Sequence, residues 1–146
     1  MNLERINALW DALEFPTEAR LAMATKYSQP STGQWLPDAL DAWERTLAAV
    51  QARQNLLDEY AEFERAGSDP RRLIRGSSTN RLLEEKTRKV FARKIAASAK
   101  AITDLNTYLF KTFGDVLLVR GEPYLQIMPH EVSSILFALE EERLAM

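Results

Sequence analysis

Two long stretches of the chain carry hydrophobic residues at helical spacing. In residues 38–65 and again in residues 80–113, apolar side chains recur every three or four positions. A helix turns once per 3.6 residues, so this spacing gathers the apolar side chains on one face, which needs a packing partner. At 1.5 Å per residue, the first helix is a rod of about 40 Å. For the second helix the pattern predicts a core stripe of Leu83, Phe91, Ile95, Ile102, Leu105, Leu109 and Phe113.

Shorter helices are expected on both sides of this long pair. Residues 2–14 have an apolar side, Pro16 ends that helix, and Thr17 can start a second one that runs to about Lys26. Residues 27–37 are rich in proline and hydroxyl side chains and indicate a loop, which we expect to be fixed to the core by Trp35 and Leu36.

The segment after the second long helix predicts a turn and a last helix. Gly114 ends the long helix, and residues 116–123 indicate a short extended piece followed by a turn. Pro129 suits the first position of a closing helix. The inward side chains of that helix are expected to be Ile135, Leu136, Leu139 and Leu144.

A short basic insert separates the two long helices. Asp69 followed by Pro70 is a helix-start signal, and Gly76 allows little more than one turn before the chain changes direction. The insert is therefore predicted to form a compact corner. That corner carries three cations that need an acidic partner or solvent, namely Arg71, Arg72 and Arg75.

Length and composition indicate one all-α domain over residues 1–146. The chain is 46% hydrophobic and 27% charged, which suits a domain with a substantial core. No apolar run approaches the roughly 20 residues that cross a bilayer, so no membrane partner is expected. The sequence has no cysteine, which excludes disulfides and thiolate chemistry and favours a reducing, intracellular compartment.

Charge is distributed in three blocks along the chain. Residues 1–66 have a net charge of −5, residues 67–100 of +7, and residues 101–146 of −4. Such an asymmetry bears on partners rather than on fold. It directs attention to the basic block in the middle.

The cations of the second long helix gather on one side. At 100° per residue, five of them fall within roughly 60° opposite the core stripe: Lys86, Lys89, Arg93, Lys100 and Lys111. Arg81 and Arg88 lie at a flank of the stripe. Solvated faces usually mix signs, with Glu–Lys pairs four residues apart, and this side hardly does. The pattern therefore favours a binding face, and a merely solvated face is the alternative.

The chemistry of known active sites is missing from the sequence. His130 is the only histidine, so triads and multi-histidine metal sites are excluded. There is no glycine-rich phosphate loop and no nucleophile elbow. The glutamate clusters fall on exposed helical positions, and Trp10, Trp35 and Trp43 are interpreted as core anchors. We expect neither an enzyme nor a cofactor or metal.

The basic insert and its flanks carry a resemblance to a known family. The chain reads FERAGSDPRR and then LLEEKTRK, preceded at residues 9–20 by LWDALEFPTEAR and followed at residues 114–128 by GDVLLVRGEPYLQIM. In this order the motifs resemble the spectrin-like domain of the protein-regulator-of-cytokinesis / anaphase-spindle-elongation family of microtubule crosslinkers. Arg72 and Lys86 match basic positions of that family. Leu83 departs from it, because a basic residue is frequent there, and Arg81 is the nearest substitute.

The resemblance implies a spectrin-like antiparallel bundle that binds the acidic surface of microtubules, in the cytoplasm and on a cytoskeletal array such as a spindle, cortical array or axoneme. The binding residues it implies, together with the basic pattern, are Arg71, Arg72, Arg75, Arg81, Lys86, Lys89, Arg93 and Lys100. Two alternatives stay open. One is a nucleic-acid-binding bundle, disfavoured because no exposed aromatic platform accompanies the cations; the other is a protein scaffold with a solvated basic face.

A monomer is the expected state of this chain. Family members crosslink microtubules through a long coiled-coil rod that holds two domains apart. Here the residues before the first long helix are interrupted by Pro16, Pro30 and Pro37. Bivalent bridging therefore has no visible basis in the sequence.

Overall fold

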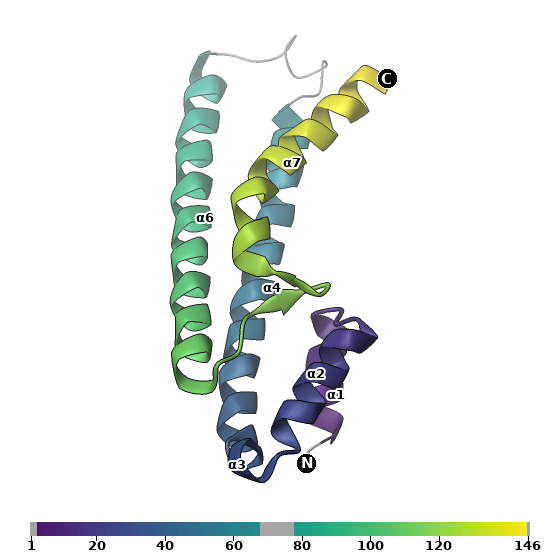
Figure 1. The fold of residues 1–146 in the computed structure, drawn as a ribbon. Helices are drawn as coiled ribbons and strands as arrows, with labels where there is room; N and C mark the ends of the chain where they lie inside the picture. Colours follow the sequence, from purple (N-terminus) through teal and green to yellow (C-terminus); the bar gives the residue numbers. More distant parts are fainter. Residues whose placement is uncertain (1–2, 68–77, 146) are drawn as a thin grey trace.

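Two long antiparallel helices form the frame of the protein (Figure 1). The computed structural model describes residues 3–67 and 78–145. Helix α4 spans Leu36–Gly67, and helix α6 spans Ser78–Phe113 and packs along it. The all-helical bundle with two long helices is thus confirmed, and both helices begin two residues earlier than the sequence predicts.

Three short helices gather at the end of the frame where α4 begins. Helix α1 spans Leu3–Ala12, α2 spans Thr17–Tyr27, and α3 spans Pro30–Gly33. The break at Pro16 is confirmed, because this residue directly precedes α2 with an extended backbone. The predicted loop of residues 27–37 contains the one-turn helix α3, which has a proline in its first turn.

A small β-hairpin connects α6 to the last helix. Strand β1, Leu118–Val119, pairs antiparallel with β2, Glu122–Pro123. Arg120 and Gly121 form the turn with φ values of 53° and 80°, the positive angles that a two-residue hairpin turn requires. A side chain at Gly121 would meet the Pro16 ring at 2.8 Å, so the hairpin lies tightly against the turn between α1 and α2. The predicted extended piece and turn are confirmed.

The last helix, α7, is longer than expected. It spans Tyr124–Ala145, so Pro129 lies inside it rather than at its first position. It packs against α4, and its second half diverges from α6 (Figure 1), while Glu142 in that half still pairs with Arg65 of α4 at 3.2 Å. Prolines inside helices are a usual cause of such bends, because the missing N–H removes one hydrogen bond.

The hydrophobic core lies at one end of the frame. It joins the short helices, the first half of α4, the last half of α6, the hairpin and the start of α7. The fully buried side chains in it include Ile6, Leu40, Ile102, Leu117 and Tyr124. The other end of the frame has mainly Leu57, Tyr60 and Leu139 buried, with Phe63 and Phe91 half-buried.

Several residues predicted to lie in the core are exposed there. Leu83 is 56% exposed, because it lies roughly 120° from Phe113 around α6 and falls outside the face that α4 covers. Leu136 and Leu144 are also exposed, since α7 packs on one neighbour and buries a narrow stripe that includes Leu139. Those three assignments were wrong.

Other core assignments hold in part. Trp10, Trp43 and Leu36 are buried as expected, whereas Trp35 is 42% exposed and does not anchor its loop. Ile102, Leu109 and Phe113 are buried, and Phe91, Ile95 and Leu105 are half-buried. Over the described ranges, no helix is both long and apolar enough to cross a membrane.

Candidate functional site

The basic face of α6 consists of Lys86, Lys89, Arg93, Lys100 and Lys111. All five side chains are exposed. They are exposed because the opposite side of α6, with Ile102 and Leu109 at its centre, is buried against α4. The periodicity in the sequence therefore gives the orientation of this helix correctly over most of its length.

The charges on this face are largely uncompensated. Within the described part of the chain, no ion pair involves Lys86, Lys89 or Arg93. Lys100 pairs with Asp104 one turn away at 3.1 Å, with both side chains mostly exposed. An exposed pair of this kind is worth less than about 1 kcal/mol, so Lys100 remains available to a partner.

The two flanking arginines differ from the face and from each other. Arg88 is half-buried, pairs with Glu64 at 2.8 Å and with Glu85, and lies over the Phe63 ring. It is therefore part of the packing between α4 and α6. Arg81 is exposed at the start of α6, roughly 140° around the helix from Lys86, so it does not belong to the same face. The predicted corner of Arg71, Arg72 and Arg75 lies outside the described residues.

Exposed apolar side chains accompany the cations. Leu82, 66% exposed, points to the same side as Lys86 and Lys89, and Leu83 and Val90 lie along one border of the face. A face that only binds phosphate needs cations and polar donors. The mixture of cations and leucines is more typical of a surface that contacts protein.

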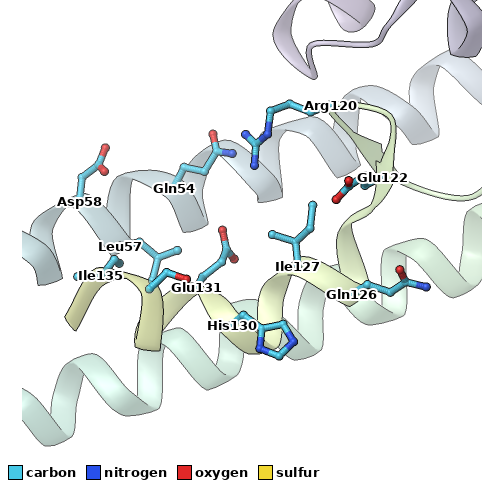
Figure 2. A pocket seen from close by; sticks show the side chains of 11 residues that line it. Gln54, Leu57, Asp58, Arg120, Glu122, Gln126, Ile127, His130, Glu131 and Ile135 are labelled. Carbon is cyan, nitrogen blue, oxygen red and sulfur yellow. The ribbon is translucent and has the colours of Figure 1, made fainter. Parts of the chain in front are cut away.

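A groove of about 550 Å³ lies between α4 and the first half of α7, next to the hairpin (Figure 2). Its walls come from α4, the hairpin and the first half of α7, and its polar residues have mixed charge. The residues that line it are Gln54, Leu57, Asp58, Arg120, Glu122, Gln126, Ile127, His130, Glu131, Ser134 and Ile135. His130 is exposed there, as the sequence predicts for a solvated residue.

The deepest charge near this groove serves the fold. Arg53 on α4 is 2% exposed, and its side chain joins α4 to α6 and α7. Its guanidinium donates to Ile95 O (2.9 Å) and Ser98 Oγ (2.7 Å) on α6. On α7 it donates to Glu131 Oε1 (2.9 Å) and Met128 O. Sequence reasoning missed this residue, because an arginine inside an apolar stripe resembles an interruption.

Tyr124 completes the same network. Its hydroxyl donates to Glu131 at 2.9 Å, and burial together with this hydrogen bond raises the pKa of Tyr124. The phenol therefore stays neutral, and Glu131 accepts hydrogen bonds from both Arg53 and Tyr124. These groups already satisfy one another, and in the described ranges no cluster of three or more acidic or histidine side chains could hold a metal ion. The groove therefore has the character of a surface depression.

A second tyrosine gives the protein a measurable pH response. Tyr60 Oη donates a hydrogen bond to Glu64 Oε2 at 2.9 Å. Burial is the larger cause and this hydrogen bond the next one, and they raise the pKa of Tyr60 to about 12. An unfolded tyrosine has a pKa of about 10. The folded state thus holds the proton more tightly, so this stabilisation is complete below pH 10 and is lost as the pH rises from about 10 to 12.

We expect Tyr60→Phe to reduce the loss of stability in that pH window. Denaturant titrations at several pH values measure it, and one group contributes at most about 1.4 kcal/mol per pH unit. Phenylalanine keeps the ring contact with Phe91, so the variant should fold normally at neutral pH. Tyr27 and Tyr124, whose pKa values are also raised by burial, still titrate in the variant. Identical slopes for the two proteins would contradict the assignment.

The fold and this surface define a class: a mainly helical domain with an exposed basic helix face whose charges are largely uncompensated among the described residues. Over 143 residues the chain is 34% identical to coiled-coil domain-containing protein 87 of Mus musculus and 30% identical to that of Homo sapiens. The matches cover 96% of this chain and 17% of each relative, so the chain spans about one sixth of their length. No family model matches the chain, and no solved structure matches it.

These matches correct the family assignment. The resemblance to the protein-regulator-of-cytokinesis / anaphase-spindle-elongation family was wrong, since the chain is similar along nearly all its length to coiled-coil domain-containing protein 87. The motifs that carried the resemblance are mainly features that many helical hairpins share. An acidic N-cap, a proline after it and glutamates in the next first turn all serve to start a helix.

Proposed function

We propose that the chain is a non-enzymatic protein-binding domain, and that the basic face of α6 binds an acidic protein surface. The observation that supports this most is a row of exposed cations, Lys86, Lys89 and Arg93, on the side of α6 that faces away from α4. These cations have no ion pair with any residue that the structure describes. Elsewhere on the bundle, the half-buried Arg5 and the exposed Arg65 have carboxylate partners. A partner's carboxylates would provide for α6 what the chain itself does not.

Protein is favoured over nucleic acid as the partner. Leu82, Leu83 and Val90 lie in or beside the face and would lose their exposed surface against another protein. Against a phosphate backbone they would gain little. The relatives are named for a coiled-coil domain, and a coiled coil is itself a helix-pairing device. That name supports an interaction role for this segment.

Microtubules stay a prediction as one such partner. The family resemblance no longer supports microtubules as the partner. Their remaining support is that their surface is acidic, which is the charge that the basic face requires of a partner. The spindle and cytokinesis roles depended on the resemblance alone, so we do not propose them. A cytoskeletal location follows only if a filament proves to be the partner.

Reversing three cations should abolish binding while leaving the fold intact. We expect the wild-type chain to cosediment with an acidic protein polymer, either microtubules or actin filaments, at low salt, and to dissociate as salt screens the charges. The triple variant Lys86→Glu, Lys89→Glu and Arg93→Glu should lose at least nine-tenths of the pelleted protein. That loss corresponds to a binding free energy weaker by about 1.4 kcal/mol or more. Circular dichroism melting should change little, because all three side chains are exposed.

A control variant with the same net charge isolates the face. Arg45, Arg120 and Arg143 are also exposed, and they lie on other elements. Reversing those three to glutamate should leave cosedimentation nearly unchanged. If the three reversals on the basic face leave pelleting unchanged, or if the chain binds a DNA duplex through the same three cations instead, the proposal is wrong. Pelleting with neither polymer would exclude filaments as the acidic partner.

A further inference from the structure

Two exposed apolar pairs lie at the end of the bundle where the core is thin. On α6, Leu83 and Val90 are 56% and 38% exposed, and on α7, Phe137 and Leu144 are 66% and 75% exposed. Each pair is seven residues apart. Seven residues are almost two helical turns, so both members of a pair point in nearly the same direction. We call these pairs the α6 stripe and the α7 stripe.

The charges that flank the two stripes have opposite signs. Lys86 and Arg93 of the basic face lie roughly 60° around the helix from the α6 stripe. Glu140 and Glu141 lie on either side of the α7 stripe, within roughly 60° of it. Each stripe therefore has the spacing of one side of a coiled-coil contact, and the two have complementary borders.

Neither stripe is covered by the residues of its own chain that the structure describes. Helices α6 and α7 both pack on α4, and the second half of α7 diverges from α6 (Figure 1). Glu140 forms an ion pair with Arg143 at 2.5 Å, but both side chains are half exposed. Such a pair is weak and can be exchanged for another. Glu141 has no ion pair within the described part of the chain.

We propose that a second copy of this chain is a partner of the basic face, with the α7 stripe of each copy on the α6 stripe of the other. This inference rests on the proposed function, since it assigns the same face a protein partner. The start of α6 and the end of α7, which carry the stripes, lie at the same end of the molecule (Figure 1). A two-fold axis near that end would form both contacts at once.

The symmetric arrangement doubles a contact that would be small by itself. A stable interface buries roughly 800 Å² per partner, and each stripe offers only a few large side chains. In a two-fold dimer every copy contributes both stripes. Leu82 and Leu136, each one residue before a stripe residue, are exposed as well. A monomer was expected because the sequence shows no basis for a coiled-coil rod. These exposed surfaces provide a different route to a dimer.

Sedimentation equilibrium of the 146-residue chain tests the dimer directly. The wild-type chain should show a concentration-dependent monomer–dimer equilibrium that weakens with salt. Lys86→Glu with Arg93→Glu should raise the dissociation constant at least tenfold, because both contacts of the dimer become repulsive. Glu140→Lys with Glu141→Lys should do the same, and unchanged circular dichroism melting should show that both variants fold.

Mixing the two variants provides the decisive measurement. In a mixed dimer the reversed α6 of one copy meets the reversed α7 of the other, and the two native surfaces meet as well. Both contacts are then attractive, so the mixture should dimerise although neither variant does so alone. A wild-type chain that stays monomeric up to about 1 mM, or a mixture no more associated than its components, overturns the inference.

Polymer cosedimentation separates this result from the proposed function. The variant reversed at Glu140 and Glu141 keeps its basic face, so it should still pellet with an acidic polymer while it fails to dimerise. A monomeric wild-type chain that pellets would leave the proposed function standing without the dimer. A dimer that pellets with no polymer would mean that the second copy is the acidic partner and that the filament prediction is wrong.

Discussion

Replacing Arg53 by alanine should lower the free energy of unfolding by about 3–5 kcal/mol, the usual cost of breaking a buried ion pair by removing one partner. Arg53 is 2% exposed, and its guanidinium joins α4 to both α6 and α7. Its removal leaves Glu131, which is 18% exposed, without its cation. It also leaves Ile95 O and Met128 O without this donor. Urea denaturation monitored by circular dichroism measures the loss.

Two further variants separate the charge from the packing. Arg53→Met fills most of the space without a charge and should still destabilise, because Glu131 keeps only the Tyr124 hydroxyl. Combining Arg53→Met with Glu131→Leu removes both charges and should recover a large part of the loss, since apolar replacements of buried pairs are often neutral. Arg93→Ala, at an exposed arginine without an ion pair in the described ranges, should change stability by less than about 0.5 kcal/mol. Equal losses for Arg53→Ala and Arg93→Ala would contradict the role given to Arg53.

The long helices could be predicted because their pattern extends over many turns. An error at one position, such as Leu83, does not change the orientation that Ile102, Leu109 and Phe113 impose on α6. The basic face follows from the same periodicity, since the side opposite a buried stripe must be exposed. The sequence could not show how far α7 diverges, because that depends on packing around Pro129 rather than on helix propensity. Leu136 and Leu144 were misplaced for this reason.

Charged residues that join distant segments were not predictable from spacing. Arg53 looks like an interruption of an apolar stripe, and Asp115 looks like an ordinary loop residue after Gly114. Their partners nevertheless lie at least 42 and 72 residues away in the sequence. Only tertiary contacts show which charges are structural and which remain available. That distinction also applies to Arg88, which periodicity places at a flank of the core stripe and which in the structure pairs with Glu64.

Replacing Asp115 by alanine should destabilise the opposite end of the bundle by about 3 kcal/mol. The carboxylate is only 10% exposed and accepts hydrogen bonds from Tyr27 Oη at 2.5 Å and Trp43 Nε1 at 2.9 Å. Lys26 Nζ pairs with it and also donates to Phe113 O at the end of α6. Without Asp115, the buried donors of α2 and α4 lose their common acceptor, and each unsatisfied donor costs about 1–3 kcal/mol.

A conservative variant and a surface control test that explanation. Asp115→Asn keeps one acceptor oxygen and loses the charge, so its cost should fall between those of the wild-type and alanine proteins. Asp104→Ala removes a carboxylate whose one ion pair among the described residues is the exposed pair with Lys100, and it should cost less than about 0.5 kcal/mol. Thermal and urea unfolding of the three variants decide the matter. If Asp115→Ala proves as mild as Asp104→Ala, then solvent satisfies these donors, and the three helical segments are held together by the apolar core alone.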